Sequence, residues 1–193
     1  MGSELIEGSI LIRPYRAEDI GPLFEAARES VNEISCWLPW CHANYAIEET
    51  EAFVLSRDEA WNNEMEYDFG VFDSGTGRFL GGVGLNQINR AHQIANLGYW
   101  VRSSATGRGV ATSAARLAAR FGLEQLRLRR IEILAAVGNR ASQRVAEKVG
   151  AAREGVLRHR LLVNGTSQDA VIFSLLPEDF NILPHDDQRS KEL

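Results

Sequence analysis

The stretch VRSSATGRGVATSAARLA, residues 101–118, places Gly107 and Gly109 two positions apart, directly before a run of small apolar residues. Apolar residues recur at helical spacing after Gly109, which predicts a helix packed against a sheet. A helix N-terminus exposes unpaired N–H groups and about half a positive charge, so it binds anions readily. Glycine lets a phosphate approach the backbone, because it has no Cβ. Taken alone, this strand-to-helix junction is either a phosphate cradle or a tight turn with solvated arginines.

Two common phosphate-binding motifs do not match these glycines. A Walker A loop needs a lysine followed by Ser or Thr after its last glycine, and no lysine follows here. A dinucleotide fingerprint needs a third glycine where Thr112 stands, and an acidic residue at the end of the next strand. The acid at about the right distance, Glu132, begins the next predicted strand instead. NAD binding is therefore not expected.

The hydrophobic pattern along the rest of the chain alternates between strand and helix periods. Helices are predicted over 18–31, 46–61, a segment that begins after Gly109, and 139–149. Strands are predicted over 10–13, 67–73, 79–89, 94–102, 130–137, 154–163 and 168–176, the last two joined by a turn at Asn164-Gly165. This order predicts one α+β domain of mixed α/β layers. We expect a single domain over 1–193, with its core over about 9–177 and a polar tail over 178–193.

Composition narrows the classes of partner. The net charge of −5 argues against a nucleic-acid partner. No apolar run reaches the roughly 18 residues of a membrane span, and the N-terminus has no signal-peptide pattern. We therefore expect a cytoplasmic protein without a membrane partner. Cys36 and Cys41 flank WLPW, but the histidines are too scattered to complete a zinc site, so no metal is expected.

A second motif follows the fifth predicted strand, in NRASQRVAEKVGAAREG, residues 139–155. Asn139 at the strand end and Ser142 three positions later are also consistent with simple capping of the next helix. Together, the two segments resemble the GNAT superfamily of acyl-CoA N-acyltransferases. GYWV with TGRGVATSA is similar to that family's pyrophosphate loop, and NRASQRVAEKVGA is similar to its Asn-x-x-Ser helix. WLPW, AREG and the hairpin VNGTSQDAVIFSLL resemble the branch that acetylates the N-termini of ribosomal proteins.

The resemblance implies a largely antiparallel, twisted sheet with helices on both faces and a splayed central pair of strands. It implies acetyl-CoA as cosubstrate, whose pyrophosphate binds backbone amides of Ser104, Thr106, Gly107, Arg108, Gly109, Val110 and Ala111, with the Thr112 hydroxyl beside them. Val101 would pair with the pantetheine arm, and Asn139 would hydrogen-bond it. Ser142 would protonate the departing thiolate. Trp37 and Trp40 lie in the loop that caps the acceptor side, either as a clamp on the acceptor or as core anchors. The basic residues Arg127, Arg129 and Arg130 form either a solvated face or a site for the CoA 3′-phosphate.

The sequence departs from the family pattern where many relatives have a Glu that serves as base. Asn96 stands there and cannot accept a proton, and Glu154, Asp169 and His92 are weak substitutes. An α-amino group with a pKa near 7.7–8.0 is roughly a tenth neutral at pH 7, whereas a lysine is under about 0.1% neutral. A missing base therefore favours an α-amino acceptor, such as a protein N-terminus. A small amine or antibiotic acceptor, a non-catalytic acyl-CoA-binding module and a homodimer all stay open.

Overall fold

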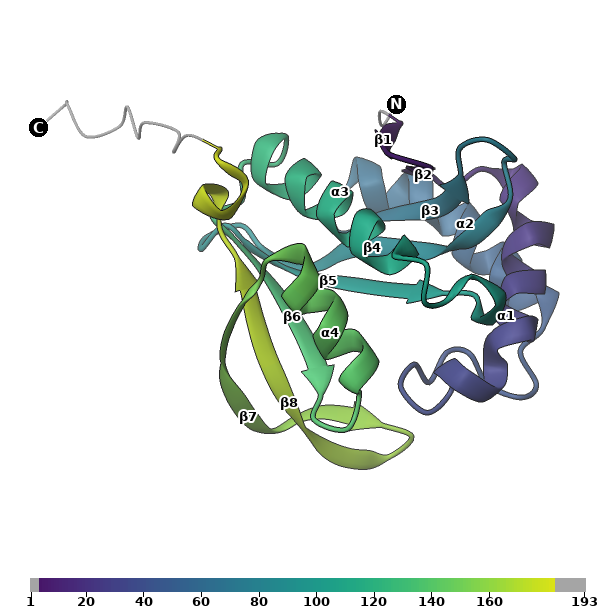
Figure 1. Ribbon diagram of the computed structural model, residues 1–193. Coiled ribbons are helices and arrows are strands. Elements are labelled where there is room, and N and C mark those ends of the chain that lie inside the picture. The colour runs from purple at the N-terminus through teal and green to yellow at the C-terminus, as the bar shows by residue number, and fades with distance from the viewer. Residues whose placement is uncertain (1–3, 183–193) are drawn as a thin grey trace, which may run out of the picture.

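The computed structural model describes residues 4–182, which form one sheet flanked by helices (Figure 1). Its strands are β1 (Leu5–Glu7), β2 (Ile10–Pro14), β3 (Tyr67–Asp73), β4 (Phe79–Asn89), β5 (Ile94–Val101), β6 (Arg130–Ala136), β7 (Ala152–Val163) and β8 (Thr166–Leu175). Its helices are α1 (Ile20–Ile34), α2 (Ile47–Asn62), α3 (Val110–Glu124) and α4 (Arg140–Val149). Short 3₁₀ turns cover Ala17–Asp19, Ser103–Ala105 and Pro177–Phe180. Among residues 4–182, no helix is long and apolar enough to span a membrane.

The strand order is β1-β2-β3-β4-β5-β6-β8-β7, and the described pairs are antiparallel except for β5 with β6. That parallel pairing covers only Ile94–Asn96 on β5 and stops at Asn96 opposite Glu132. Beyond this point the two strands diverge, as Figure 1 shows. The predicted mixed architecture with a splayed central pair is confirmed.

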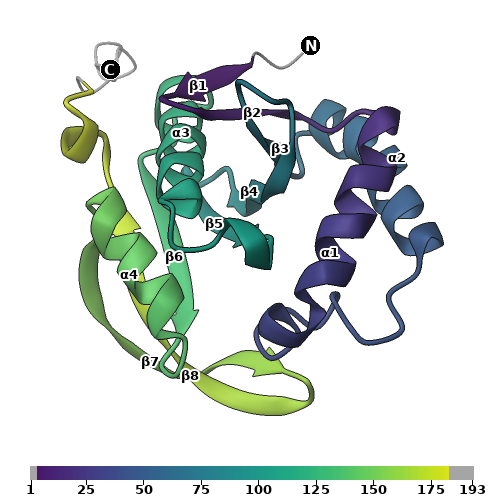
Figure 2. The ribbon, with the colours of Figure 1, turned by 45° about the vertical axis from the view of Figure 1, so that its right-hand side comes forward.

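Successive side chains of a strand point to opposite faces of the sheet, so apolar residues are present on both faces. Helices cover both of these faces. Phe69 and Val71 of β3 pack with Phe121 of α3 in one buried cluster. Phe72 of the same strand packs in a second cluster, which includes Leu23 of α1. Figure 2 shows α1 and α3 on opposite sides of β2–β5. The edge where β5 and β6 separate therefore lies between two layers of helices, and the site is located there.

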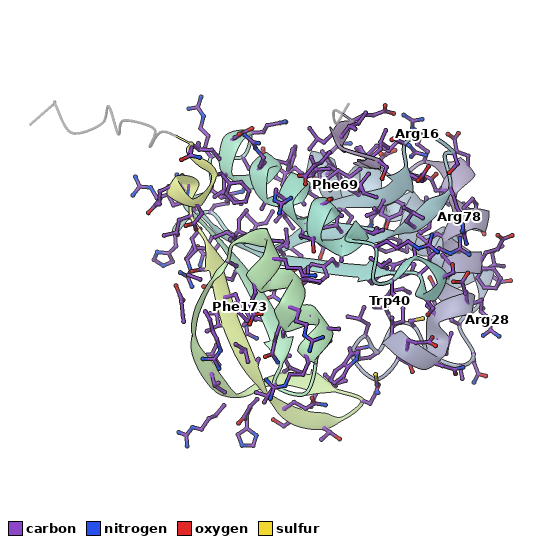
Figure 3. All side chains as sticks on the ribbon, in the orientation of Figure 1. Arg16, Arg28, Trp40, Phe69, Arg78 and Phe173 are labelled. Carbon is purple, nitrogen blue, oxygen red and sulfur yellow. The ribbon has the colours of Figure 1, made fainter. Side chains whose placement is uncertain are left out.

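The splay divides the sheet into a first arm, β1–β5, and a second arm, β6–β8–β7, and each arm carries a fully buried phenylalanine. Phe69 lies on β3 and Phe173 on β8, and both side chains are fully buried (Figure 3). The β7–β8 hairpin extends from the second arm, and its tip returns to α1, where Asn164 Nδ2 donates to the Ser35 carbonyl at 3.1 Å. The predicted Asn164-Gly165 turn is present, with both residues in the left-handed region.

The structure departs from the sequence prediction at the ends of the chain. β1 was not expected, because a three-residue strand is too short to show a period. Phe180 and Ile182 pack against the core, so the packed chain continues past residue 177. The rest of the predicted polar tail, residues 183–193, lies outside the described residues.

Candidate active site

The loop between β5 and α3 presents a row of unpaired backbone N–H groups. Its two glycines have left-handed backbone, with φ of 75° at Gly107 and 81° at Gly109. A Cβ at either position would meet no atom within 4 Å, so the space above is open. The first helical bond of α3 runs from the Ser113 N–H to the Gly109 carbonyl at 3.0 Å. In the described part of the chain, no acceptor contacts the N–H groups of residues 107–112, a row that includes the predicted donors Arg108, Val110 and Ala111, and Thr112 as well.

Two predicted amide donors are used inside the protein. The Ser104 N–H donates to Glu29 Oε1 at 2.7 Å, and the Thr106 N–H donates to a carbonyl of its own 3₁₀ turn at 3.2 Å. Ser104 Oγ accepts from Arg78 Nη2 at 3.0 Å. The free part of the loop therefore begins at Gly107, later than the sequence predicted.

Arg102 is held by α1 and is not directed at the open space above the loop. Its Nε donates to Glu29 Oε2 at 3.0 Å, and its Nη1 donates to the Phe79 carbonyl at 3.2 Å. The bond from Arg102, with those from Ser104, lowers the pKa of Glu29 to about 2. Ser30 Oγ accepts the neighbouring Ser103 N–H at 3.0 Å. These contacts tie the loop between β5 and α3 to the C-terminal half of α1.

The Asn-x-x-Ser motif forms the first turn of α4. Asn139 Oδ1 accepts the Ser142 N–H at 3.0 Å, so Asn139 caps the helix, as the simpler alternative predicted. The Tyr99 hydroxyl lies 2.9 Å from the Ser142 carbonyl and 3.1 Å from Ser142 Oγ. Burial raises the pKa of Tyr99 to about 12, with the Ser142 bond opposing the shift. At neutral pH this phenol is therefore a hydrogen-bond donor, and it joins β5 to α4 across the splay.

Val101, the last residue of β5, pairs with Gly81 of β4 on one side. On its other side, β5 has no ladder partner after Asn96 among residues 4–182. Backbone groups at the edge of a strand can pair with another extended chain. Val101 thus lies on the exposed edge where the pantetheine arm is predicted to bind.

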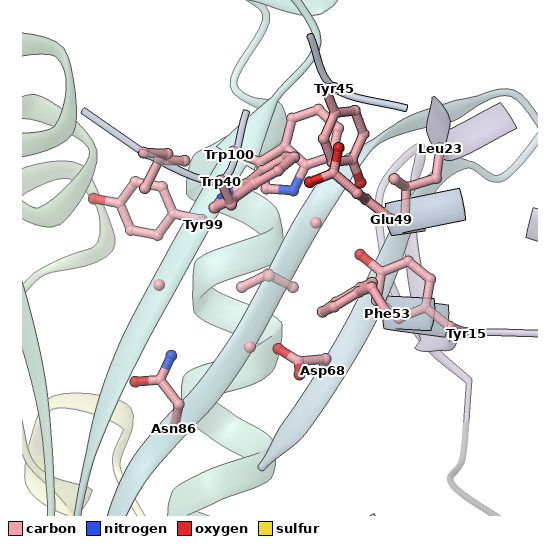
Figure 4. Close-up of a pocket in the computed structure, with 15 residues that line it drawn as sticks. Tyr15, Leu23, Trp40, Tyr45, Glu49, Phe53, Asp68, Asn86, Tyr99 and Trp100 are labelled. Carbon is pink, nitrogen blue, oxygen red and sulfur yellow. The ribbon is translucent and has the colours of Figure 1, made fainter. Parts of the chain in front are cut away.

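A cavity of about 510 Å³ lies on the other side of β5, between β3–β5 and helices α1 and α2. Its lining is mainly aromatic and glycine, with few charges: Tyr15, Leu23, Leu38, Trp40, Tyr45, Glu49, Phe53, Asp68, Gly82, Val83, Gly84, Asn86, Gly98, Tyr99 and Trp100. Figure 4 shows Asp68 and Asn86 on the sheet below the aromatic rings. Because Gly98, Tyr99 and Trp100 belong to the part of β5 that pairs with β4 but no longer with β6, the cavity reaches the splay.

The two tryptophans of the WLPW loop have different environments. Trp40 lines the cavity, with its ring centroid 5.4 Å from that of Trp100 and 5.5 Å from that of Tyr45. Trp37 lies outside the lining and faces Gly138, where an added Cβ would be 3.4 Å from its ring. Trp40 is therefore placed to contact an acceptor, and Trp37 packs near the first turn of α4.

Glu154 and Arg130 hold each other at the second arm of the sheet. Arg130 donates to both carboxylate oxygens of Glu154, at 2.7 and 2.6 Å, and Ser174 donates to Oε1 at 2.7 Å. Arg130, followed by Ser174, lowers the pKa of Glu154 to about 2. Glu154 is thus a poor base, and Arg130 is engaged in an ion pair away from the loop between β5 and α3.

The other residues considered as bases are also placed for structural roles. Asp169 Oδ1 accepts the His159 N–H at 2.8 Å inside the β7–β8 hairpin. His92 lies in the turn before β5, roughly 20 Å from Tyr99 at about 3.3 Å per strand residue. Asn96 donates to Asn86 Oδ1 at 2.9 Å, and its own buried oxygen contacts no donor in the described part of the chain.

Both cysteines are free, Cys36 exposed and Cys41 buried, and burial raises the pKa of Cys41 to about 11. Within the described residues, no group of three or more His, Cys, Asp or Glu side chains could hold a metal ion.

The cavity floor was not anticipated from the sequence. Gly82 and Gly84 of β4 lie on the same face of the sheet, and their lack of side chains lets neighbouring polar groups approach the strand: the Tyr15 hydroxyl and the Trp100 indole N–H lie over Gly82. The Asp68 carboxylate occupies the space over Gly84, 2.1 Å from where a Cβ would be. The signal was available in FLGGVGL, because glycines at alternate positions of a strand mark a close approach of another group.

Comparisons with known proteins agree with this geometry. The family model described as an acetyltransferase (GNAT) domain matches residues 9–152. YdaF of Bacillus subtilis is provisionally named a ribosomal N-acetyltransferase. It is 36% identical over 174 residues, which cover 89% of this chain and 93% of YdaF. The spermidine N(1)-acetyltransferase of Escherichia coli is 28% identical over 171 residues, covering 84% of this chain and 83% of that enzyme.

A solved structure from Vibrio cholerae, described provisionally as a ribosomal-protein-serine acetyltransferase, superposes with a TM-score of 0.79 at 28% identity. The match covers 91% of this chain and 98% of that one.

Proposed function

The chain belongs to the GNAT family of N-acetyltransferases, and from this premise we propose that it acetylates the N-terminal α-amine of a protein, of the ribosomal type, with acetyl-CoA as donor. The name of YdaF and the description of the Vibrio cholerae structure support this acceptor. The mechanism is direct attack of the amine on the thioester in a ternary complex.

The phosphate-binding loop supplies the donor site of this proposal. The N–H groups of residues 107–112 hold the CoA pyrophosphate, because they are unpaired, share one helix N-terminus and face open space. The free edge of β5 up to Val101 pairs with the pantetheine arm, and the Asn139 amide group hydrogen-bonds it. This brings the thioester along β5 toward the first turn of α4.

Ser142 stands where the thiolate departs. It is the third residue of α4, so the positive end of the helix favours negative charge beside it. Its hydroxyl protonates the thiolate sulfur, with Tyr99 holding that hydroxyl from across the splay.

One observation carries the assignment of the acceptor site. Gly98, Tyr99 and Trp100 line the cavity and also belong to the stretch of β5 that leaves β6. A thioester in the splay and an amine in the cavity therefore meet at the same three residues. Trp40 covers the amine from the loop, and Trp37 supports that loop.

Thiol release from acetyl-CoA tests the function directly. Purified protein is assayed with N-terminal peptides, polyamines and aminoglycosides, and mass spectrometry locates the acetyl group. We expect peptides to be acetylated on the α-amine, and Gly109→Asp to abolish release. Acetylation confined to lysine side chains would contradict the α-amine assignment, and no release with any amine would contradict the enzymatic function.

A polyamine acceptor is the second candidate. It is favoured by the similarity to the spermidine acetyltransferase and by the two carboxylates, Asp68 and Glu49, that line the cavity. A higher kcat/KM for spermidine than for any peptide in the same panel would select it.

A further inference from the structure

Asp68 is the less exposed of the two charged groups that line the cavity, and one of its oxygens accepts no hydrogen bond among the described residues. Arg57 Nη1 binds Oδ2, and none of the hydrogen bonds found among residues 4–182 uses Oδ1. The side chain is only 18% exposed. Figure 4 shows the carboxylate directed into the cavity beside Phe53 and Tyr15. Oδ1 is therefore an accessible acceptor on a largely buried carboxylate, and it faces the space where an amine would enter.

The register of the sheet leads from this carboxylate to the splay. Asp68 of β3 is paired with Gly84 of β4, and Gly84 with Gly98 of β5. Oδ1 lies over Gly84, and neighbouring strands are about 4.8 Å apart, so the carboxylate is about one strand spacing from Gly98. An ammonium nitrogen at about 2.8 Å from Oδ1, on its β5 side, would lie close to Gly98. No side chain at Gly84 or Gly98 blocks this path.

The local charge favours a cation. Arg57 is shared between Asp68 and Glu66, whose Oε2 it contacts at 2.7 Å, so the three groups together carry one negative charge. Aromatic rings of Tyr15, Phe53, Trp40 and Trp100 also line the cavity, and their faces attract cations.

We propose that Asp68 is a catalytic carboxylate of this enzyme: it binds the acceptor amine as an ammonium ion and accepts its proton. The proposal rests on the proposed acetyltransferase function and supplies the base that Asn96 does not. The acceptor is thereby a primary amine that enters in its protonated form. Burial raises the pKa of Asp68, with Arg57 opposing the shift, which makes the carboxylate a better proton acceptor than an exposed one.

The step balances as follows. One proton passes from the ammonium to Asp68, and the freed nitrogen lone pair forms a bond to the thioester carbonyl carbon. The C–S bond breaks, its electron pair leaves on sulfur, and the Ser142 hydroxyl gives that thiolate a proton. The second surplus proton of the nitrogen restores Ser142, and Asp68 releases its proton to solvent. The products are the amide, free CoA and one proton.

Asp68→Asn is the first test, with Glu66→Gln as its matched control. Both variants remove one carboxylate from Arg57, but only Asp68 lines the cavity. We expect Asp68→Asn to lower kcat/KM for the amine at pH 7 by about 100-fold or more, as loss of a general base does. Acetyl-CoA affinity should stay unchanged, and Glu66→Gln should stay within about threefold of wild type. Activity of Asp68→Asn within threefold of wild type would overturn the proposal.

The pH profile gives a second test, which begins with the wild-type protein. The charged and titratable groups around Asp68 are Arg57, Glu66 and Glu49, with Tyr15, Tyr45 and Tyr99. If Asp68 receives the proton, kcat/KM is flat between the pKa of Asp68 and that of the amine. In Asp68→Asn, kcat/KM should instead rise about tenfold per pH unit up to the pKa of the amine. A wild-type profile that already rises in this way would contradict the proposal. The wild-type profile can be measured even if the Asp68→Asn variant does not fold.

Failure of the function is separable from failure of Asp68. If no amine releases thiol from acetyl-CoA, the role of Asp68 is tested by the binding of a peptide amine alone. The fluorescence of Trp40 and Trp100 reports this binding. Asp68→Asn should then raise the Kd at least tenfold over wild type and over Glu66→Gln. Equal Kd values in the three proteins would overturn the site.

Discussion

The Tyr99 hydroxyl on β5 hydrogen-bonds both the carbonyl, at 2.9 Å, and the hydroxyl oxygen, at 3.1 Å, of Ser142 on α4. When Tyr99 donates to the carbonyl, its own oxygen is free to accept the Ser142 proton. The pair spans the point where the two arms of the sheet separate. Tyr99 thus fixes the direction of the hydroxyl that faces the splay.

Tyr99→Phe should lower kcat about tenfold and leave acetyl-CoA affinity nearly unchanged, because the ring still packs while Ser142 loses its partner. Steady-state kinetics with a saturating acceptor measures the split between kcat and KM. Tyr67→Phe is the control, because its hydroxyl contacts only Arg90 among the described side chains, far from the splay. Equal kcat values for Tyr99→Phe and wild type would remove Tyr99 from the mechanism.

Ser142→Ala should lower kcat without changing stability, because the capping bond uses the backbone N–H of residue 142. Asn139→Ala, by contrast, should lower the free energy of unfolding by about 1 kcal/mol, because the helix loses its N-cap. Thermal unfolding and turnover, measured on both variants, separate the two roles. A kcat of Ser142→Ala equal to that of wild type would leave residue 142 with a structural role alone.

Gly109→Asp should abolish the rise in Tm that acetyl-CoA produces, because it places a carboxylate beside the pyrophosphate and strains a left-handed residue. Gly150→Asp is a matched control, since Gly150 also has a positive φ, of 102°, but ends α4 away from the loop. Both variants should lose about 1–2 kcal/mol from backbone strain. Only Gly150→Asp should keep the acetyl-CoA effect, and a full effect in Gly109→Asp would contradict the loop assignment.

Glu29→Gln should make the protein less stable at pH 7 but not near pH 2. Arg102 and Ser104 lower the pKa of Glu29 to about 2, below its usual value of about 4.3 when unfolded. The stabilisation is therefore complete above about pH 4.3 and is lost as the pH falls toward 2. Urea unfolding across this range measures it. A difference between variant and wild type that does not shrink below pH 4 would show that Glu29 is not the titrating group.

The sequence predicted the elements whose signals are local. The loop at Gly107 and Gly109 and the first turn of α4 each lie within a few consecutive residues, so spacing alone could place them. Asp68 was missed because its position depends on the pairing of β3, β4 and β5, which no single segment encodes.

The contacts of Arg102 also could not be predicted from a single segment of the sequence. Its partner Glu29 is 73 positions away in the chain. Only the packing of α1 against the loop could reveal that ion pair.

Helix α1 contacts both the cavity and the loop between β5 and α3. Leu23 faces the cavity, and Glu29 and Ser30 hold the phosphate-binding loop about 9 Å farther along the axis at 1.5 Å per residue. A tilt of α1 that widens the cavity therefore pulls on Arg102 and Ser104. We therefore expect the two proposed substrates to bind cooperatively or anticooperatively: by reciprocity, whatever factor acetyl-CoA applies to the affinity for the amine, the amine applies to acetyl-CoA.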